Sequence, residues 1–284
     1  MKVLITGGTG FVGRYVVEEL ENKYQLVLPV RNPEKLESKG PGITVEEFPE
    51  DLSTVVEKHS PDVVINLLGI LNEEPKKGIT FEKVHVEFVR QLVDGAKRSG
   101  VKKFIQMSAL GADENSKSRY ARTKAEGERL VIDSGIDYVI LRPSIILGKG
   151  QKLFEDLKKF SLLTPVLLAP KGRVQPVHID DVVNTIKKAV EDESLRNEII
   201  ELCGTRIVSY KELFEFALSY IGRKRIVIEM PSGFFWFMLP VFRLLPEPPV
   251  TEDQLYLLEK DNVCSGKHKT QKDILGQVKV AFKV

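Results

Sequence analysis

The apolar positions of the chain first form a regular pattern in residues 1–31. An apolar run at residues 3–5 predicts a buried strand, the spacing of Val16, Val17 and Leu20 predicts a helix, and an apolar run at residues 26–28 predicts a second strand. The segment TGGTGFVG, with three spaced glycines, separates the first strand from the helix. This order of elements predicts a mononucleotide-binding βαβ unit.

The three glycines have separate tasks in such a unit. Gly7 allows the tight turn, Gly10 lets backbone amides approach a pyrophosphate, and Gly13 lets the helix pack close to the strand. The helix N-terminus adds free N–H groups and the positive end of the helix dipole. We therefore expect a bound dinucleotide, with a merely structural turn as the alternative.

The end of the second strand bears on which nucleotide binds. An NAD site usually has Asp or Glu about 20 residues after the glycines, whereas this chain has Arg31, followed by Asn32 and Pro33. The planar guanidinium of Arg31 suits a 2′-phosphate. This favours NADP(H) over NAD(H). Two alternatives remain: Glu34 could serve an NAD site, and Arg31 could be a solvated loop cation.

Further apolar runs predict more strands, at residues 43–45, 62–68 and 103–108. The run at 62–68 is continuous except for Asn66 and ends at Gly69, which is typical of a central parallel strand. Ligands bind at the carboxyl ends of such strands. We expect Asn66, Leu67, Leu68 and Gly69 to line the cofactor, with ordinary strand-end turn chemistry as the alternative.

Two polar residues in this part of the chain have competing interpretations. Asp51 suits either the adenine edge of a nucleotide or the N-cap of a helix over residues 52–59. His85 lies in a helix predicted over residues 81–96, and we expect it to be packed or solvated rather than to act as a base.

A helix with a serine N-cap is predicted from residue 116 to the glycine at 135. Tyr120, Lys124, Gly127 and Val131 share one of its faces, which we expect to pack on the sheet because Gly127 permits close approach. The ammonium of Lys124 would favour the phenolate and lower the pKa of Tyr120, as suits a proton donor to a carbonyl. The alternative is that Lys124 extends past the sheet edge to solvent.

At this point the chain resembles a known family. The segment TGGTGFVG, Ser108, and the spacing Tyr120-x-x-x-Lys124 are similar to the short-chain dehydrogenase/reductase superfamily, in its extended or atypical branch. Residues 141–148 (LRPSIILG) and 177–182 (VHIDDV) extend the resemblance. Residues 250–255 (VTEDQL) and 258–263 (LEKDNV) resemble more narrowly the NADPH-binding accessory subunits of respiratory complex I and their bacterial relatives.

The resemblance implies roles for individual residues. Tyr120 would donate or accept the proton, and Lys124 would hold the nicotinamide ribose. Thr9, Phe11 and Val12 would meet the pyrophosphate, and Pro143, Ser144 and Ile145 the carboxamide. The extended branch usually has its catalytic hydroxyl just after the first serine of the loop, where this chain has Ala109. Either Ser108 takes that role or the hydroxyl is missing. Loss of such a hydrogen-bond donor weakens transition-state stabilisation by on the order of 3 kcal/mol.

Composition narrows the class of protein. The 284 residues include 42 Lys and Arg and 40 Asp and Glu. With a net charge of only +2 and no basic run, nucleic acid is not expected as a partner. Two cysteines without CxxC spacing fit a reducing compartment and argue against a zinc site or a disulfide framework. We expect no metal, no signal peptide and a cytoplasmic location.

The second half of the chain is less regular. Helices are predicted over residues 153–163, 182–190 and 210–221, and strands over 199–202 and 225–228. We expect an α/β fold: a Rossmann-type doubly wound parallel sheet of about seven strands with a small C-terminal α/β lobe. Residues 1–150 would form the NAD(P)-binding core, and residues 151–284 would complete it and form the lobe, with His178 at a strand end near the cleft.

Residues 234–245 are mostly apolar but too few to span a bilayer. They suit a helix that covers the lobe, a wall for an apolar substrate such as a quinone or lipid, or a contact with a membrane surface or respiratory complex. Two functional hypotheses result. The protein is an NADP(H)-dependent oxidoreductase acting on a carbonyl or quinone-like substrate, or a non-catalytic subunit that holds NADPH.

Overall fold

The computed structural model describes residues 1–38, 40–244 and 248–282. Its main feature is an eight-stranded sheet with the order β3-β2-β1-β4-β5-β6-β11-β14, in which neighbouring strands run parallel. The strands are β1 (Lys2–Thr6), β2 (Gln25–Val30), β3 (Ile43–Glu47), β4 (Val63–Asn66), β5 (Lys103–Met107), β6 (Asp137–Pro143), β11 (Glu198–Leu202) and β14 (Lys269–Thr270). The predicted Rossmann-type fold is confirmed. The sheet has one strand more than expected because the short β14 pairs with β11.

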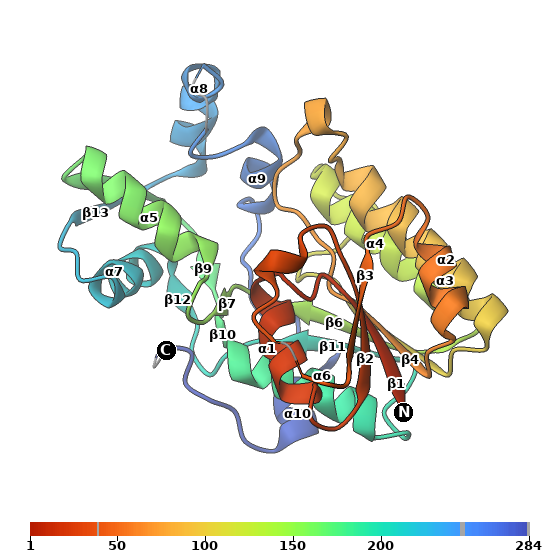
Figure 1. Ribbon diagram of the computed structural model, residues 1–284. Coiled ribbons are helices and arrows are strands. Elements are labelled where there is room, and N and C mark those ends of the chain that lie inside the picture. The colour runs from red at the N-terminus through yellow and green to blue at the C-terminus, as the bar shows by residue number, and fades with distance from the viewer. Residues whose placement is uncertain (39, 245–247, 283–284) are drawn as a thin grey trace.

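Helices cover both faces of this sheet (Figure 1). One layer holds α1 (Phe11–Leu20), α6 (Ile179–Glu191) and α10 (Gln271–Leu275), and the other holds α2 (Leu52–His59), α3 (Phe88–Ser99) and α4 (Arg119–Ile132). Val3 and Ile5 of β1 pack in the core under the first layer, and Leu4 packs in the core under the second. Burial on both faces explains why the central strands are continuous apolar runs.

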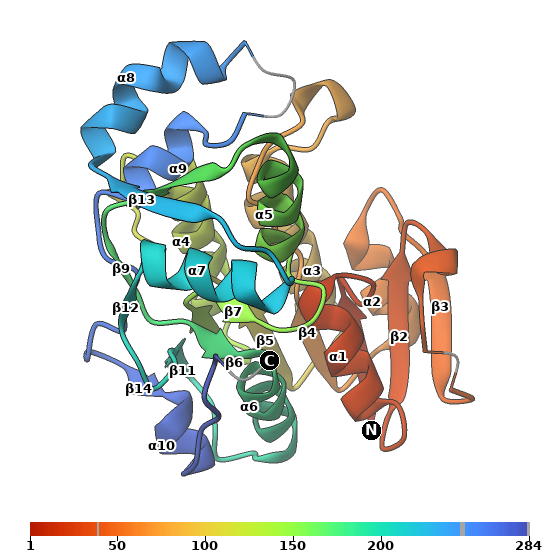
Figure 2. The ribbon, with the colours of Figure 1, turned by 90° about the vertical axis from the view of Figure 1, so that its left-hand side faces the viewer.

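A smaller group of elements lies over the carboxyl-end side of the sheet (Figure 2). It contains β7 (Ile146–Leu147), α5 (Lys152–Leu163), β8 (Val166–Pro170), β9 (Arg173–Val174), β10 (Val177–His178), β12 (Val208–Ser209), α7 (Tyr210–Tyr220), β13 (Ile226–Met230), α8 (Ser232–Phe242) and α9 (Glu252–Leu257). Phe154, Leu213 and Val227 belong to its core. Residue 245, the end of the predicted apolar segment, lies outside the described residues.

The helix predicted over residues 81–96 is not regular. A short π-helix, η3 (Lys83–Glu87), precedes α3, and it packs against α4. A Cβ atom at position 127 would lie 2.4 Å from the backbone oxygen of His85. Gly127 therefore permits close approach of η3 rather than of the sheet, which corrects the expected contact.

Cys203 and Cys264 form a disulfide. The expectation from the sequence was wrong here: the cysteines are 61 residues apart, and nothing local indicates that the end of β11 meets the segment before β14. Hydrogen bonds support the pair, since Cys203 N–H donates to Gln271 Oε1 (3.0 Å) and Cys264 N–H to Gln175 Oε1 (3.1 Å). The cysteine count therefore no longer argues for a reducing compartment.

No helix within the described ranges has both the length and the apolar character to cross a bilayer.

Candidate nucleotide and proton-transfer site

The glycine turn closes tightly at the carboxyl end of β1. Gly7 has a φ of +74°, and its carbonyl oxygen accepts the N–H of Gly10 at 2.9 Å. A Cβ atom at position 13 would lie 2.1 Å from that same oxygen. No side chain of the described residues caps α1, so side chains leave its first N–H groups available to a ligand. This geometry fits a diphosphate.

Arg14 lies one turn into α1 and contacts the turn after β7. Its guanidinium packs near the rings of Phe11 (5.8 Å) and Tyr15 (5.1 Å) and donates a hydrogen bond to the backbone oxygen of Lys149. Arg14 thus joins the nucleotide-binding turn to the later part of the chain.

Arg31 follows β2 directly and is exposed. Its guanidinium lies 5.3 Å from the centre of the Phe48 ring, and it makes no ion pair with any described residue. Asn32 accepts the N–H of Glu34 at 3.1 Å and so shapes the loop, while Lys35 is exposed beside it. The cation is therefore held by an aromatic ring at the edge where an adenosine ribose binds in this fold.

A row of polar side chains crosses the ends of three strands. Thr6, Asn66 and Gln106 stand opposite one another in the sheet register. Thr6 Oγ1 donates to Asn66 Oδ1 (2.6 Å), and Asn66 Nδ2 donates to Gln106 Oε1 (2.9 Å). Asn66 Oδ1 also accepts the N–H of Leu68 (3.2 Å). Asn66 therefore shapes the crevice from within, and its partners Thr6 and Gln106 were not predicted from the sequence.

Lys124 is buried between the ends of β4 and β5. Its Nζ donates to the backbone oxygen of Met107 (3.2 Å). A Cβ atom added at position 69 would lie 3.1 Å from this Nζ, so the ammonium lies against Gly69. The alternative that Lys124 extends to solvent is thus excluded. Burial lowers the pKa of Lys124 to about 8, and the nearby carboxylate of Glu128 opposes this shift.

Tyr120 packs edge-on against two rings, those of Phe81 (5.7 Å) and His85 (5.4 Å). Burial raises the pKa of Tyr120 above its ordinary value, and the charge of Asp253 raises it further. The expected lowering of the Tyr120 pKa was wrong, because burial and the Asp253 charge both raise it, while the ammonium of Lys124 is bonded to Met107.

His85 is packed and uncharged. Its Nε2 accepts the N–H of Ile70 (3.2 Å), so Nδ1 carries the hydrogen and faces Thr123 Oγ1 (3.0 Å). Burial, with the charge of Lys124 as a smaller cause, lowers the pKa of His85 to about 2. His85 thus joins the loop after β4 to α4, as a packed residue and not a base.

Ser108 has a buried hydroxyl with no hydrogen-bond partner among the described residues. Its backbone N–H donates to Leu141 (2.7 Å), which fixes the loop that also holds Ala109. A buried hydroxyl without a partner is costly unless a ligand completes it. Ser108 is therefore suited to contact a bound molecule.

The segment predicted to meet the carboxamide, residues 143–145, is held by a residue that sequence reasoning missed. Ser144 Oγ donates to Asn262 Oδ1 at 2.5 Å, and Ser144 N–H donates to Leu202. The segment before β14 therefore crosses beside this loop.

Two other candidates are helix caps. Asp51 accepts the N–H of Ser53 (2.9 Å) at the start of α2, and His178 accepts the N–H of Asp180 (3.1 Å) at the start of α6. For Asp51, this selects the capping interpretation.

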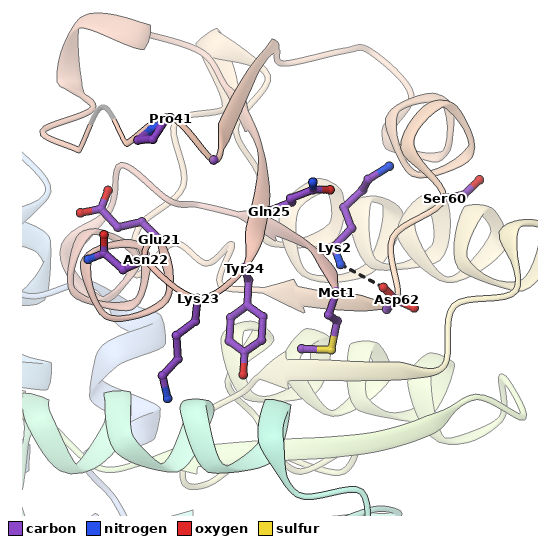
Figure 3. Close-up of a pocket in the computed structure, with 11 residues that line it drawn as sticks. Met1, Lys2, Glu21, Asn22, Lys23, Tyr24, Gln25, Pro41, Ser60 and Asp62 are labelled. Carbon is purple, nitrogen blue, oxygen red and sulfur yellow. Dashed lines mark hydrogen bonds between the residues drawn. The ribbon is translucent and has the colours of Figure 1, made fainter.

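A hollow of about 640 Å³ lies at the opposite ends of the strands (Figure 3). Its lining includes Lys2, Lys23 and Asp62, and the backbone N–H of Lys2 donates to Asp62 at 2.9 Å. Ligands of open parallel sheets bind at the carboxyl ends. We therefore assign it no part in the site.

Comparisons with known proteins agree with this geometry. A family model described as NAD(P)H-binding matches residues 7–159. The 40 kDa subunit of mitochondrial NADH-ubiquinone oxidoreductase from Neurospora crassa is 28% identical over 284 residues, covering 95% of this chain and 74% of the relative. Ceramide reductase from Caulobacter vibrioides is 29% identical over 240 residues, covering 81% and 74%.

Among solved structures, UDP-glucuronic acid 4-epimerase from Bacillus cereus, in complex with UDP-glucuronic acid and NAD, has a similar fold. Its TM-score is 0.73 at 19% identity, with 99% of this chain and 95% of that chain covered. The glycine turn, the parallel sheet and the family match lead to one conclusion: the chain belongs to the NAD(P)H-binding family and has the fold of an atypical, extended short-chain dehydrogenase/reductase.

Proposed function

We propose that the protein is an NADP(H)-dependent oxidoreductase that transfers hydride between the nicotinamide and a carbonyl or quinone-like substrate. The observation that carries the proposal is that Lys124, one turn along α4 from Tyr120, is buried and bonds to Met107, next to the unpartnered hydroxyl of Ser108. A relative named ceramide reductase supports carbonyl chemistry on an apolar substrate.

In this proposal bound NADPH supplies the hydride. Burial and Asp253 keep the phenol of Tyr120 protonated near neutral pH, which a proton donor needs. The buried ammonium of Lys124 would hold the nicotinamide ribose, and Ser108 would orient the substrate oxygen in place of the hydroxyl absent at Ala109.

The catalytic proposal is tested by NADPH consumption over aldehydes, ketones and quinones. Replacing Tyr120→Phe removes the donated proton and should lower the rate by about 10²- to 10⁴-fold. Calorimetry with NADPH should give the same affinity for both proteins, which separates chemistry from binding. Equal background rates in both would remove the enzyme proposal and leave nucleotide binding intact.

The preference for NADP(H) rests on Arg31. Replacing Arg31→Ala should weaken NADPH binding about tenfold, because a charged hydrogen bond to the 2′-phosphate is lost, and leave NADH binding unchanged. Lys35→Ala is the control, since Lys35 is also exposed but is not held by an aromatic ring. If Arg31→Ala weakened NADPH and NADH binding equally, Arg31 would not be the residue that selects NADP(H).

A second candidate function is that of a subunit that holds NADPH without turnover. Ala109 favours it, as do the relatives named as subunits of NADH dehydrogenases. The outer face of α8 also favours a peripheral contact with a membrane or a respiratory complex, since Phe237 is 80% exposed and Val241 51%. Phe235 and Leu239, on the opposite face, are buried.

Flotation with anionic vesicles tests the membrane contact. Phe237→Ser should reduce the bound fraction severalfold, because an exposed ring contributes about 1.5–3 kcal/mol when it is buried. Val45→Ser, at an exposed apolar position on β3, is the control. No difference between the variants would count against a membrane and leave a protein partner as the occupant.

A further inference from the structure

The segment 250–255 resembles a narrower subfamily, yet the proposed chemistry gives it no task. It forms α9, which begins with a capping box: Thr251 Oγ1 accepts the N–H of Gln254, and Gln254 Oε1 accepts the N–H of Thr251. The helix lies against α4. The contact between them involves Asp253.

The carboxylate of Asp253 accepts hydrogen bonds from the start of α4. Its donors are Ser118 Oγ (2.7 Å), the N–H of Arg119 (2.5 Å) and the N–H of Tyr120 (3.2 Å). First-turn N–H groups have no partner within their own helix, and a negative charge there is favoured by the helix dipole. A residue from the far end of the chain thus completes the turn that carries the phenol.

Asp253 is itself held in place by its neighbours on α9. Gln254 Nε2 donates to Asn72 Oδ1 (3.1 Å), whereas the pair of Glu252 with Arg243 at the end of α8 is exposed and contributes little. Leu255 is completely buried against α8. The carboxylate therefore has a fixed position relative to α4.

The groups that face Tyr120 come from three elements. Phe81 and His85 contribute rings, Lys124 lies one turn along α4, and Asp253 is at its start. His85 is neutral, and the ammonium of Lys124 is bonded to Met107. Asp253 is thus the charge with the clearest effect on the phenol.

We propose that Asp253 is a positioning residue for Tyr120: its carboxylate fixes the first turn of α4 and so sets where the phenol points. This rests on the proposed role of Tyr120 as proton donor. The same charge opposes loss of the phenol proton, so its removal lowers the pKa of Tyr120.

The test compares Asp253→Asn and Asp253→Ala with Glu252→Gln. The control removes the same charge one residue earlier, where the side chain pairs with Arg243 and, among the described residues, makes no hydrogen bond to α4. In both Asp253 variants, the amide hydrogens of Arg119 and Tyr120 should exchange at least about fivefold faster, as for a lost cap. The NMR chemical shift of the Tyr120 ring should change as well. This signal is assigned in ¹³C-tyrosine-labelled protein as the one that is missing in Tyr120→Phe.

Turnover provides a second readout. In Asp253→Asn, kcat should fall about tenfold while the KM for NADPH stays the same, and the loss of reductase activity at high pH should begin at a lower pH than in the wild type. A merely structural contact would not move the pH profile.

The outcomes distinguish the two proposals. If the wild type shows no turnover, but the Asp253 variants show faster amide exchange and a shifted Tyr120 ring signal, the positioning role is retained and the catalytic proposal is rejected. Exchange, ring signal and pH profile that are the same in Asp253→Asn as in Glu252→Gln would overturn the positioning role, whether or not the enzyme is active.

Discussion

The nucleotide turn and the surroundings of Tyr120 are built in different ways. The turn is local: Gly7, Gly10 and Gly13 contact one another within one short segment. The surroundings of Tyr120 are assembled from distant parts of the chain, with His85 on a π-helix and Asp253 on α9. A local motif forms the proposed nucleotide turn, whereas the surroundings of the proposed proton donor depend on tertiary packing. The following predictions separate the two regions.

The largest effect is expected at the turn. Gly13→Ala would place a Cβ atom 2.1 Å from the oxygen of Gly7 and 2.7 Å from the Cα of Gly8, and backbone atoms cannot move aside. We expect a loss of about 3 kcal/mol or more in the free energy of unfolding, and no NADPH binding by calorimetry. Gly8→Ala is the control, because its new contacts of 3.4 Å are with side chains and should cost less than about 1 kcal/mol. Similar losses in both variants would contradict this account of the turn.

The disulfide gives the next largest effect, on the assembled region. Replacing Cys264→Ser should lower the free energy of unfolding by about 2–4 kcal/mol, because the unfolded chain is then no longer closed into a long loop and gains conformational entropy. Chemical denaturation measures this. Reductant should destabilise the wild type to the same extent and leave the variant unchanged. An effect of reductant on the variant would show that the loss has another cause.

The smallest effect concerns Lys124. The folded pKa is about 8, below the value of about 10.4 for an unfolded lysine. At pH 7 both states are protonated, and the folded state bears the cost of a buried charge. As pH rises from about 8 to about 10.4, the folded state loses its proton first, and stability increases.

The pKa gap corresponds to about 3 kcal/mol at pH 7, and loss of the hydrogen bond to Met107 offsets about 1 kcal/mol of it. Lys124→Met should therefore be more stable than the wild type by about 2 kcal/mol at pH 7, and this advantage should disappear by about pH 10.4. Denaturation at pH 7 and pH 10 measures the change. Lys76→Met, at an exposed position, should show no such trend. A constant advantage across this range would mean that packing, not charge, is responsible.

The elements that could be predicted from sequence are those with local signals. The glycine turn, the apolar strands and the Tyr120/Lys124 spacing follow from short-range periodicity. Asp253 could not be assigned to Tyr120, because 133 residues separate them. The direction of the Tyr120 pKa shift was also missed, since the neighbouring lysine is visible in sequence but the burial of the phenol is not. The Cys203–Cys264 pair likewise depends on how β11 meets a remote segment.

The late origin of Asp253 has a consequence for biosynthesis. A ribosome completes the glycine turn and the first strands long before it reaches the carboxylate that caps α4, which lies 133 residues after Tyr120. The glycine turn of the nascent chain is therefore made first, and the proposed orientation of the phenol waits until residue 253 has been made. Termination before residue 253 would remove this carboxylate together with Cys264 and β14, and the start of α4 would lack the hydrogen bonds that Asp253 accepts.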